Sequence, residues 1–212
     1  MTTRPANPIR LYHHALSGHV HRVELFLTLL DLPFEKVTID VFKREQRSAA
    51  FLARNPFGQI PVIDDGELTL ADSNAILVYL AKRYDTSGRW LPDDSVGAAR
   101  VQRWLSVAAD QLANGPATVR FAALIGRPCD GSTVKQSKAL FELMDRELGA
   151  QPFLAAATPT IADLALYAYT AHAPEGGISL EPFANVRAWL ARVEALPRFV
   201  GMQRSPIPAS AA

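Results

Sequence analysis

The sequence predicts an α/β unit with a mixed sheet, followed by an all-helical unit. Residues 8–84 alternate short strand-like and helix-like segments in the order βαβ and then ββα, the pattern of a small mixed sheet covered by helices. Residues 95–204 contain only segments with helical periodicity. Between the two units, the turn-forming residues of Asp85 to Val96 predict a linker.

The elements of the first unit follow from hydrophobic spacing. Ile9 to His13 and Phe34 to Ile39 have the pattern of strands, and the second of them alternates apolar and polar residues. Between them, apolar residues recur at three- and four-residue intervals over His19 to Asp31 and predict a helix, which Leu32-Pro33 ends.

The second half of this unit predicts a helix, a hairpin and another helix. A short helix is expected over Arg47 to Ala53. Ile60 to Ile63 and Glu67 to Leu70 predict two strands, because Asp64-Asp65-Gly66 between them is a hairpin signal. Ser73 to Tyr84 carries apolar residues on one helical face and closes the unit.

The helical unit begins with a long amphipathic helix through Trp104, and Asn114-Gly115-Pro116 predicts a kink or break in it. Further helices are predicted over Val134 to Leu148 and over Phe183 to Leu196. Thr160 to His172 is apolar on almost every side, which is typical of a helix at the centre of a bundle.

Composition excludes several classes of function. The net charge of +1 and the scattered Lys and Arg residues give no basic surface for nucleic acid or for an anionic membrane. The lone cysteine, Cys129, excludes an intrachain disulfide and a Cys-rich metal site. No segment has the apolar core of a signal peptide or the length of a membrane span, so we expect a cytoplasmic protein. The tail from Ser205 is expected to be disordered.

One candidate binding motif surrounds Ile60-Pro61 in the segment NPFGQIPV. A proline is tolerated at the start of a strand, where only the first position loses its donor. A cis bond before Pro61 would turn the backbone of Ile60 outward and leave its N–H and C=O free for a peptide ligand. Only about 5–6% of X–Pro bonds are cis, so the residues by themselves favour a trans bond.

A second candidate motif is Asp72-Ser73 at the start of a helix. Asp72 is placed to cap the helix, and Ser73 lies in its first turn. The free N–H groups and the positive end of the helix dipole suit a carboxylate. The alternative interpretation is that these residues only cap the helix.

Taken in order, these motifs resemble those of cytosolic glutathione transferases. The segments NPFGQIPVIDDGELTL and ADSNAILVYLAKRY resemble the cis-proline segment and the acidic-Ser motif of the thioredoxin-like N-terminal domain of this family. Thr160-Ile-Ala-Asp163 resembles the capping box in the central helix of the C-terminal domain. The likeness extends from about residue 9 to 203, and it implies glutathione as cosubstrate, bound between the two domains.

The resemblance implies a role for each motif residue. The backbone of Ile60, before Pro61 in the cis form, would pair with the cysteinyl part of glutathione. Ser73 would bind the γ-glutamyl carboxylate and Asp72 the amine, and Gln59 would assist nearby. The glycine carboxylate would meet a side chain before the second helix, where the candidates are Lys43, Gln46 and Arg47. These three are otherwise explained as a solvated loop.

Ser17, at the end of the loop after the first strand, is the candidate catalytic residue. Its position resembles that of the serine in serine-type classes such as theta. A hydroxyl that donates a hydrogen bond to sulfur favours the thiolate, as does the adjacent helix N-terminus. Ser17 is alternatively only a helix cap, and Tyr12 is the rival thiol-activating residue. Cys129 is too far along the chain to serve as a thiol in this loop.

Four of the five histidines lie between His13 and His21, which raises the question of a metal site. We expect none, because His19 and His21 point to different sides of a helix and no cysteine or acidic cluster completes a ligand set. His14 or His19 is instead a candidate for the mouth of the ligand pocket.

The helical unit is expected to select the electrophile. Candidate lining residues come from its first helix and from the Ser17 loop, and core packing is the competing explanation for about half of them. They are Ala15, Leu16, Trp104, Val107, Ala108, Gln111 and Phe121.

The expected function is conjugation of glutathione to small hydrophobic electrophiles, a detoxification chemistry, by a homodimer as is usual in the family. Peroxidase, dehalogenase and isomerase activities use the same fold and remain alternatives. A zeta-type isomerase carries a Ser-Ser-Cys cluster in the first loop, and this chain has only Ser17 there. A non-catalytic glutathione-binding protein is the alternative of a different class.

Overall fold

The computed structural model describes residues 4–207. A four-stranded sheet is formed by β1 (Ile9–His13), β2 (Phe34–Thr38), β3 (Val62–Asp65) and β4 (Leu68–Ala71), in the order β2-β1-β3-β4. β1 is parallel to β2 and antiparallel to β3, and β3 is antiparallel to β4. The predicted mixed sheet is therefore confirmed.

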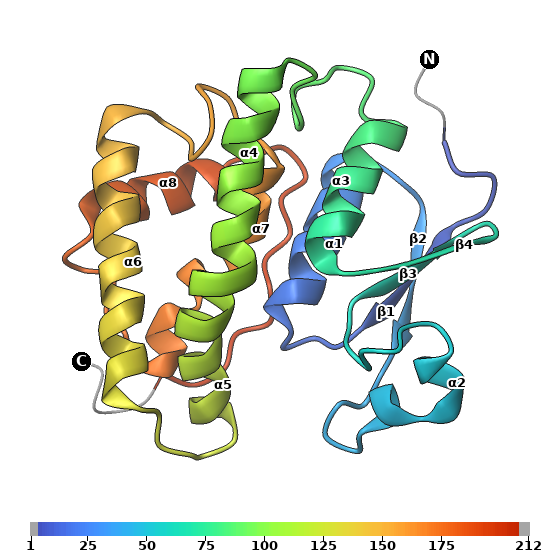
Figure 1. Cartoon of the computed structure of the whole chain (residues 1–212), viewed down its shortest axis with the longest axis horizontal. Helices are drawn as coiled ribbons and strands as arrows, with labels where there is room; N and C mark the ends of the chain where they lie inside the picture. The colour runs from blue at the N-terminus through green and yellow to red at the C-terminus, as the bar shows by residue number, and fades with distance from the viewer. Residues whose placement is uncertain (1–3, 208–212) are drawn as a thin grey trace.

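Three helices cover this sheet. α1 (Gly18–Leu29) makes the crossover that the parallel pair β1–β2 requires, and it packs with α3 (Ser73–Tyr84) against the helical part of the molecule. α2 (Ala49–Leu52) follows the 3₁₀ turn Glu45–Arg47 and packs on the sheet through Phe51, whose ring lies edge-on to Tyr12 of β1. The sheet is thus placed between α1 and α3 on one face and α2 on the other (Figure 1).

Two predicted elements have shifted boundaries with clear causes. The strand predicted from Ile60 begins at Val62, because Pro61 has no N–H to contribute to the sheet. The helix predicted over Arg47 to Ala53 is divided by Ser48, which caps α2 by accepting a hydrogen bond from the Phe51 N–H at 3.3 Å.

From Ser95 to Ile207 the chain forms helices joined by loops, with no strand among these residues (Figure 1). This part consists of α4 (Ser95–Val107), a π-helical stretch (Ala108–Ala117), α5 (Thr118–Leu124), α6 (Gly131–Ala150), α7 (Ile161–Ala171), a 3₁₀ turn (Ala173–Gly176) and α8 (Ala184–Glu194). The predicted break is present, because Gly115 leaves the helical conformation with φ −101° and ψ −105° just before Pro116. The chain changes direction there before it enters α5.

α7 lies at the centre of the helices and is almost completely buried, as its composition predicts. Thr160 and Asp163 form the predicted capping box at its N-terminus. Asp163 also accepts hydrogen bonds from the Leu154 N–H and the Trp189 Nε1–H, each at 2.9 Å. One buried carboxylate thereby connects the start of α7 to two other segments.

The expectation of a disordered tail from Ser205 is wrong for Ser205 itself. The segment after α8 runs back against α1, where His21 Nε2 donates to the Val200 carbonyl at 2.8 Å. The Ser205 hydroxyl donates to Glu175 Oε2 at 2.5 Å, so this residue is fixed by a buried charge. The remainder of the predicted tail, residues 208–212, lies outside the described residues. None of the helices between residues 4 and 207 is both long and apolar enough to cross a membrane.

Candidate active site

The strand register brings the predicted site segments to one end of the sheet. Tyr12 near the end of β1 is paired with Val62 at the start of β3, and Val62 is paired with Ala71 at the end of β4. The chain therefore leaves β1 toward Ser17, enters β3 from Ile60-Pro61 and leaves β4 toward Asp72 at the same end. Three motifs spread over almost sixty positions are adjacent in the fold for this reason.

Ser17 caps α1. Its Oγ accepts a hydrogen bond from the Val20 N–H at 3.3 Å, and its own N–H donates to the His14 carbonyl at 3.0 Å. Within residues 4–207 the hydroxyl proton of Ser17 has no acceptor. The side chain is half-buried at the positive end of a 12-residue helix, which is a favourable place for an anion.

The Ile60–Pro61 bond is cis, so the trans bond that frequency alone favoured is not the one adopted. Asn55 Nδ2 donates to the Gln59 carbonyl at 2.7 Å and fixes the loop that precedes it. The backbone N–H and C=O of Ile60 form no hydrogen bond with any part of the chain that the structure describes. These two groups are thus available to an extended peptide ligand.

Asp72 and Ser73 begin α3. Asp72 Oδ1 accepts hydrogen bonds from the N–H groups of Asn74 and Ala75, each at 2.9 Å. The backbone of Asp72 has φ +73° and ψ 120°, a conformation that costs a residue other than glycine about 1–3 kcal/mol. Ser73, which is 5% exposed, lies in the first helical turn beside it. Strain of this kind is often found where a ligand is bound.

Arg22 is a site residue that sequence reasoning missed. It is on α1 and 1% exposed, and its Nη1 donates to Asn74 Oδ1 at 2.8 Å and to Ser73 Oγ at 3.2 Å. Its Nε and Nη2 are buried without a partner, and no carboxylate among residues 4–207 forms an ion pair with it. Burial lowers the pKa of Arg22 to about 10, so it is a cation at neutral pH. The only signal in the sequence is an arginine among the apolar residues of this helix.

The first turn of α1 packs on α7. A Cβ on Gly18 would lie 2.8 Å from Cζ of Tyr169, so only glycine permits this approach. The His19 ring lies edge-on to the Tyr169 ring, with centroids 4.9 Å apart. Burial, assisted by the charge of Arg22, lowers the pKa of His19 to about 3, so the imidazole is neutral. Because the His19 ring carries no charge, the positive potential at the N-terminus of α1 comes from the backbone N–H groups and from Arg22.

The side chain of Tyr12, the alternative thiol-activating residue, lies on the face of the sheet that α2 covers. Its ring packs edge-on against Phe51 and under the guanidinium of Arg54. Its hydroxyl donates to Asp64 Oδ2 at 2.8 Å. Burial and this carboxylate raise the pKa of Tyr12. The phenol is therefore committed to a structural contact beneath α2.

The three candidates for binding the glycine carboxylate differ in how far their side chains are already bonded within the protein. Lys43 is 79% exposed and pairs with Asp40 at 3.2 Å. The amide of Gln46 is held in the loop, where its Nε2 donates weakly to the Val41 carbonyl at 3.5 Å and its Oε1 is buried without a partner. Arg47 Nη1 donates to the Phe57 carbonyl at 3.1 Å and so supports the loop before β3.

The candidate electrophile residues divide into two groups. Trp104 and Ala108, with 2% and 0% exposure, are part of the core and present no surface to a ligand. Leu16 and Val107 are half-buried, and Gln111 is exposed. Of the two further candidates, Ala15 is half-buried and the side chain of Phe121 is 55% exposed.

The histidines do not gather around a metal site. In the part of the chain that the structure describes, no three His, Cys, Asp or Glu side chains are arranged to hold an ion. His13 lies 3.4 Å from Glu24, which also pairs with Lys36 at 2.5 Å. Cys129 is half-buried in the segment between α5 and α6.

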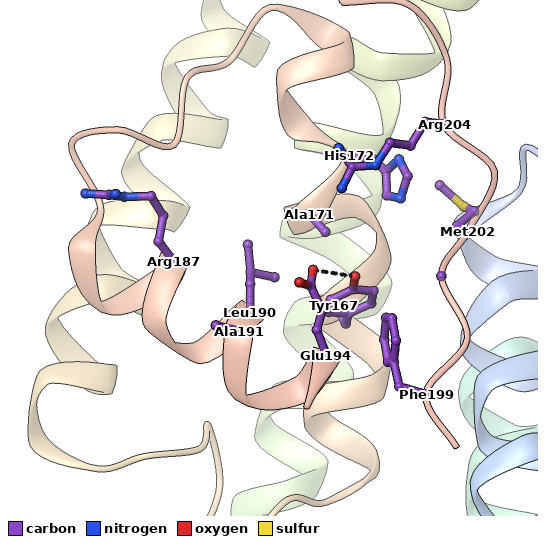
Figure 2. A pocket seen from close by; sticks show the side chains of 11 residues that line it. Tyr167, Ala171, His172, Arg187, Leu190, Ala191, Glu194, Phe199, Met202 and Arg204 are labelled. Atoms are coloured by element: carbon purple, nitrogen blue, oxygen red, sulfur yellow. Dashed lines mark hydrogen bonds between the residues drawn. The ribbon is translucent and has the colours of Figure 1, made fainter. Parts of the chain in front are cut away.

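Figure 2 shows a separate pocket of about 370 Å³ between α7, α8 and the segment that follows α8. Its walls include Leu190, Phe199 and Met202, and the Tyr167 hydroxyl donates to Glu194 Oε1 at 2.8 Å beside them. None of the residues predicted to bind glutathione or an electrophile lines this pocket.

A small mixed sheet joined to a helical bundle, with a polar site at the end of the sheet, defines a class of two-domain proteins with a thioredoxin-like first domain. Comparison with known proteins agrees. The model of the glutathione S-transferase N-terminal domain matches residues 7–82, and that of the C-terminal domain matches residues 127–197. The chain belongs to the glutathione S-transferase family.

Several relatives support this assignment. Glutathione S-transferase theta-2B of Homo sapiens is 32% identical over 198 residues, covering 88% of this chain and 81% of that protein. The crystal structure of a glutathione S-transferase from Pseudomonas fluorescens has a TM-score of 0.87 and 32% identity, covering 92% of this chain and 99% of that one. A glutathione transferase homologue from Drosophila mojavensis, crystallised with bound glutathione, has a TM-score of 0.80 and 25% identity. The match covers 90% of this chain and 89% of that one. The predicted thioredoxin-like domain and helical domain are thereby confirmed.

Proposed function

We propose that this protein binds glutathione, ionises its thiol with the help of Ser17, and adds the sulfur to an electrophilic carbon of small apolar molecules. The observation that carries the proposal is the hydrogen bonding of Ser17. Its Oγ is fixed by the Val20 N–H, while its own proton has no acceptor among the described residues. The hydroxyl can therefore donate to a sulfur anion, whereas the hydroxyl of Tyr12 is already bonded to Asp64.

The required shift of the thiol pKa is modest. A free thiol has a pKa near 8.5, and each unit of lowering corresponds to about 1.4 kcal/mol in favour of the thiolate. A hydrogen bond to a charged group contributes roughly 1.5–3 kcal/mol, and the helix N-terminus adds to it. These two effects together are large enough to make the thiol mostly ionised near pH 7.

Glutathione would lie along the three segments at the end of the sheet. The unpaired backbone groups of Ile60, before Pro61, would pair with the cysteinyl part. Ser73 would receive the γ-glutamyl carboxylate and Asp72 the amine, with Gln59 beside them. The buried charge of Arg22 lies directly behind Ser73. A carboxylate placed there would provide the anion that Arg22 lacks within the described chain.

The glycine carboxylate would meet Lys43, whose ammonium is exposed, with Gln46 as a second contact. We assign the electrophile to the surface formed by Leu16, Val107 and Gln111, since these residues are accessible. Trp104 and Ala108 would shape this surface from within the core.

The protein would act as a homodimer in the cytoplasm, where glutathione is kept reduced. Phe57, which is 75% exposed on a loop of the thioredoxin-like domain, would be a candidate contact with the partner chain.

The test compares Ser17→Ala with Ser48→Ala. Both serines cap a helix through a hydrogen bond of 3.3 Å to the third following N–H, so Ser48→Ala reproduces the structural loss alone. Glutathione affinity is measured by calorimetry, and conjugation is measured on a panel of small electrophiles. We expect Ser17→Ala to bind glutathione but to lose rate on the order of 10²-fold. Ser48→Ala should keep the rate per folded molecule.

Two outcomes would contradict the proposal in different ways. Wild-type protein that does not bind glutathione would exclude the transferase function altogether. Wild-type protein that binds glutathione without turnover would favour the non-catalytic binding protein.

A further inference from the structure

We propose that Arg120, in the helical domain, is a positioning residue that orients Ser17 by holding the preceding peptide unit. The inference rests on the function proposed for Ser17. Arg120 lies on α5, is 2% exposed, and its Nη1 donates to the Leu16 carbonyl at 2.7 Å. This contact joins residues 104 positions apart and connects the two domains at the loop that carries the serine.

The guanidinium of Arg120 is itself fixed. Its Nε donates to Glu175 Oε2 at 2.6 Å, and Glu175 is 5% exposed. Glu175 also accepts from His172 Nδ1 and from the Ser205 hydroxyl, each at 2.5 Å. Although burial opposes ionisation, these three donors hold the pKa of Glu175 below its usual value. A charged, fully engaged carboxylate therefore leaves the arginine little freedom to move.

The ion pair alone does not explain why Arg120 is present. A buried arginine–carboxylate pair is generally no more stabilising than apolar residues that fill the same volume. Arg120 Nη2 is also buried without a partner, which adds a desolvation cost. The contact that an apolar residue could not reproduce is the hydrogen bond to the Leu16 carbonyl, and that contact points to the catalytic loop.

The Leu16 carbonyl and the Ser17 N–H belong to one planar peptide unit. Arg120 holds the oxygen of this unit at 2.7 Å, and the His14 carbonyl accepts the N–H at 3.0 Å. With both ends of the plane held, the direction in which the Ser17 Cα leaves it is set. The hydroxyl proton is thereby aimed from a fixed position, and a displacement of about 1 Å can cost 10²-fold in rate.

Arg120 would also make the electrostatic potential at the glutathione sulfur more positive. An unpaired Leu16 carbonyl would present a partial negative charge one residue from the proposed thiolate site. The guanidinium neutralises this oxygen, so the loop offers a thiolate mainly positive groups. Loss of Arg120 should therefore raise the pKa of bound glutathione as well as lower the rate.

The experiment measures Arg120→Met, Arg120→Lys and Glu175→Gln in the full-length protein. Asp145→Asn is the matched control, because Asp145 ties the start of α8 to α6 through the Asn185 and Val186 N–H groups at 2.7 and 3.0 Å, and it makes no contact with the Ser17 loop. For each variant, glutathione affinity, kcat, KM and the pH profile of conjugation are compared at equal amounts of folded protein.

We expect Arg120→Met to lower kcat roughly 10- to 100-fold. Its apparent thiol pKa should rise by about half a unit to one unit, while glutathione affinity changes less than about threefold, since the binding groups at Ile60 and Ser73 are untouched. Arg120→Lys and Glu175→Gln should show the same changes in smaller amounts. Asp145→Asn should lower only the Tm.

A double variant tests whether Arg120 acts through Ser17. In the Ser17→Ala background, Arg120→Met should cost less than about twofold, because the group that it positions is already absent. An undiminished loss in that background would overturn the proposal, as would a wild-type pH profile and kcat in both Arg120 variants. If wild-type protein neither binds nor conjugates glutathione, the proposed function fails first and this inference fails with it. Failure of the Arg120 variants alone, with an active wild type, leaves the proposed function standing.

Discussion

A buried histidine on α1 makes the stability of this protein depend on pH. His21 is 3% exposed, its Nε2 donates to the Val200 carbonyl, and its Nδ1 is buried without a partner. Burial lowers the pKa of His21 to about 4. Val200 and Glu24 favour protonation, whereas His172 and Arg22 oppose it, so burial decides the direction.

The sign and size of the effect follow from this pKa. In the unfolded chain His21 titrates near 6.5, so between pH 6.5 and about 4 the unfolded state binds a proton that the folded state excludes. The free energy of unfolding therefore falls as pH falls through this window. From pH 7 to pH 5, His21 alone should remove about 2 kcal/mol.

His21→Gln isolates this contribution. Glutamine keeps an amide N–H that can donate toward the Val200 carbonyl, and it does not titrate. Urea unfolding of both proteins at pH 7 and at pH 5 gives four free energies of unfolding. We expect wild-type protein to lose about 2 kcal/mol more than the variant between these pH values. The other histidines are present in both proteins, so their contributions cancel in the comparison. Equal losses would show that His21 is accessible to protons in the folded state and would refute the reasoning.

Two further predictions concern stability in and beside the helical domain. Asp163→Ala should lower the free energy of unfolding by about 3 kcal/mol or more, because it leaves several buried donors without an acceptor. The rate of catalysis per folded molecule should stay the same. Unchanged thermal stability would contradict this prediction. Gly18→Ala should cost about 1–3 kcal/mol, since the new methyl group would lie within 3.0 Å of three Tyr169 ring atoms. Tyr169→Leu in the same chain should restore part of the loss, and calorimetric melting of the single and double variants would show whether it does.

The order of strands and helices was predictable because each signal is local. Hydrophobic periodicity, the hairpin turn and the breaks at prolines act within a few residues. The helix caps at Ser17, Asp72 and Thr160 are equally local, as each side chain meets an N–H two or three positions further on. The resemblance to the glutathione transferases rested on these same motifs, and the comparisons confirm the family and the fold.

The choice between the two candidate thiol-activating residues needed the tertiary structure. Ser17 and Tyr12 are five positions apart, and the sequence does not say which partners each one meets. Pairing with β3 brings Tyr12 beneath α2 and within reach of Asp64, and it leaves Ser17 at the end of the sheet. The assignment of Ser17 as the thiol-activating residue stays a proposal. It is supported by the hydroxyl proton of Ser17, which has no acceptor among the described residues.

By itself, the sequence determined the elements of this protein, their order, and the local caps that start its helices. Only the tertiary structure decided what lies behind the site. The Arg22 side chain meets Ser73 from 51 positions away, and Arg120 meets the Leu16 carbonyl from 104 positions away. Contacts between such distant residues leave no spacing pattern along the chain. Arg22 meets its partners only when the first domain folds, and Arg120 meets Leu16 only when the two domains pack together, so the tertiary structure was needed to separate them from surface arginines.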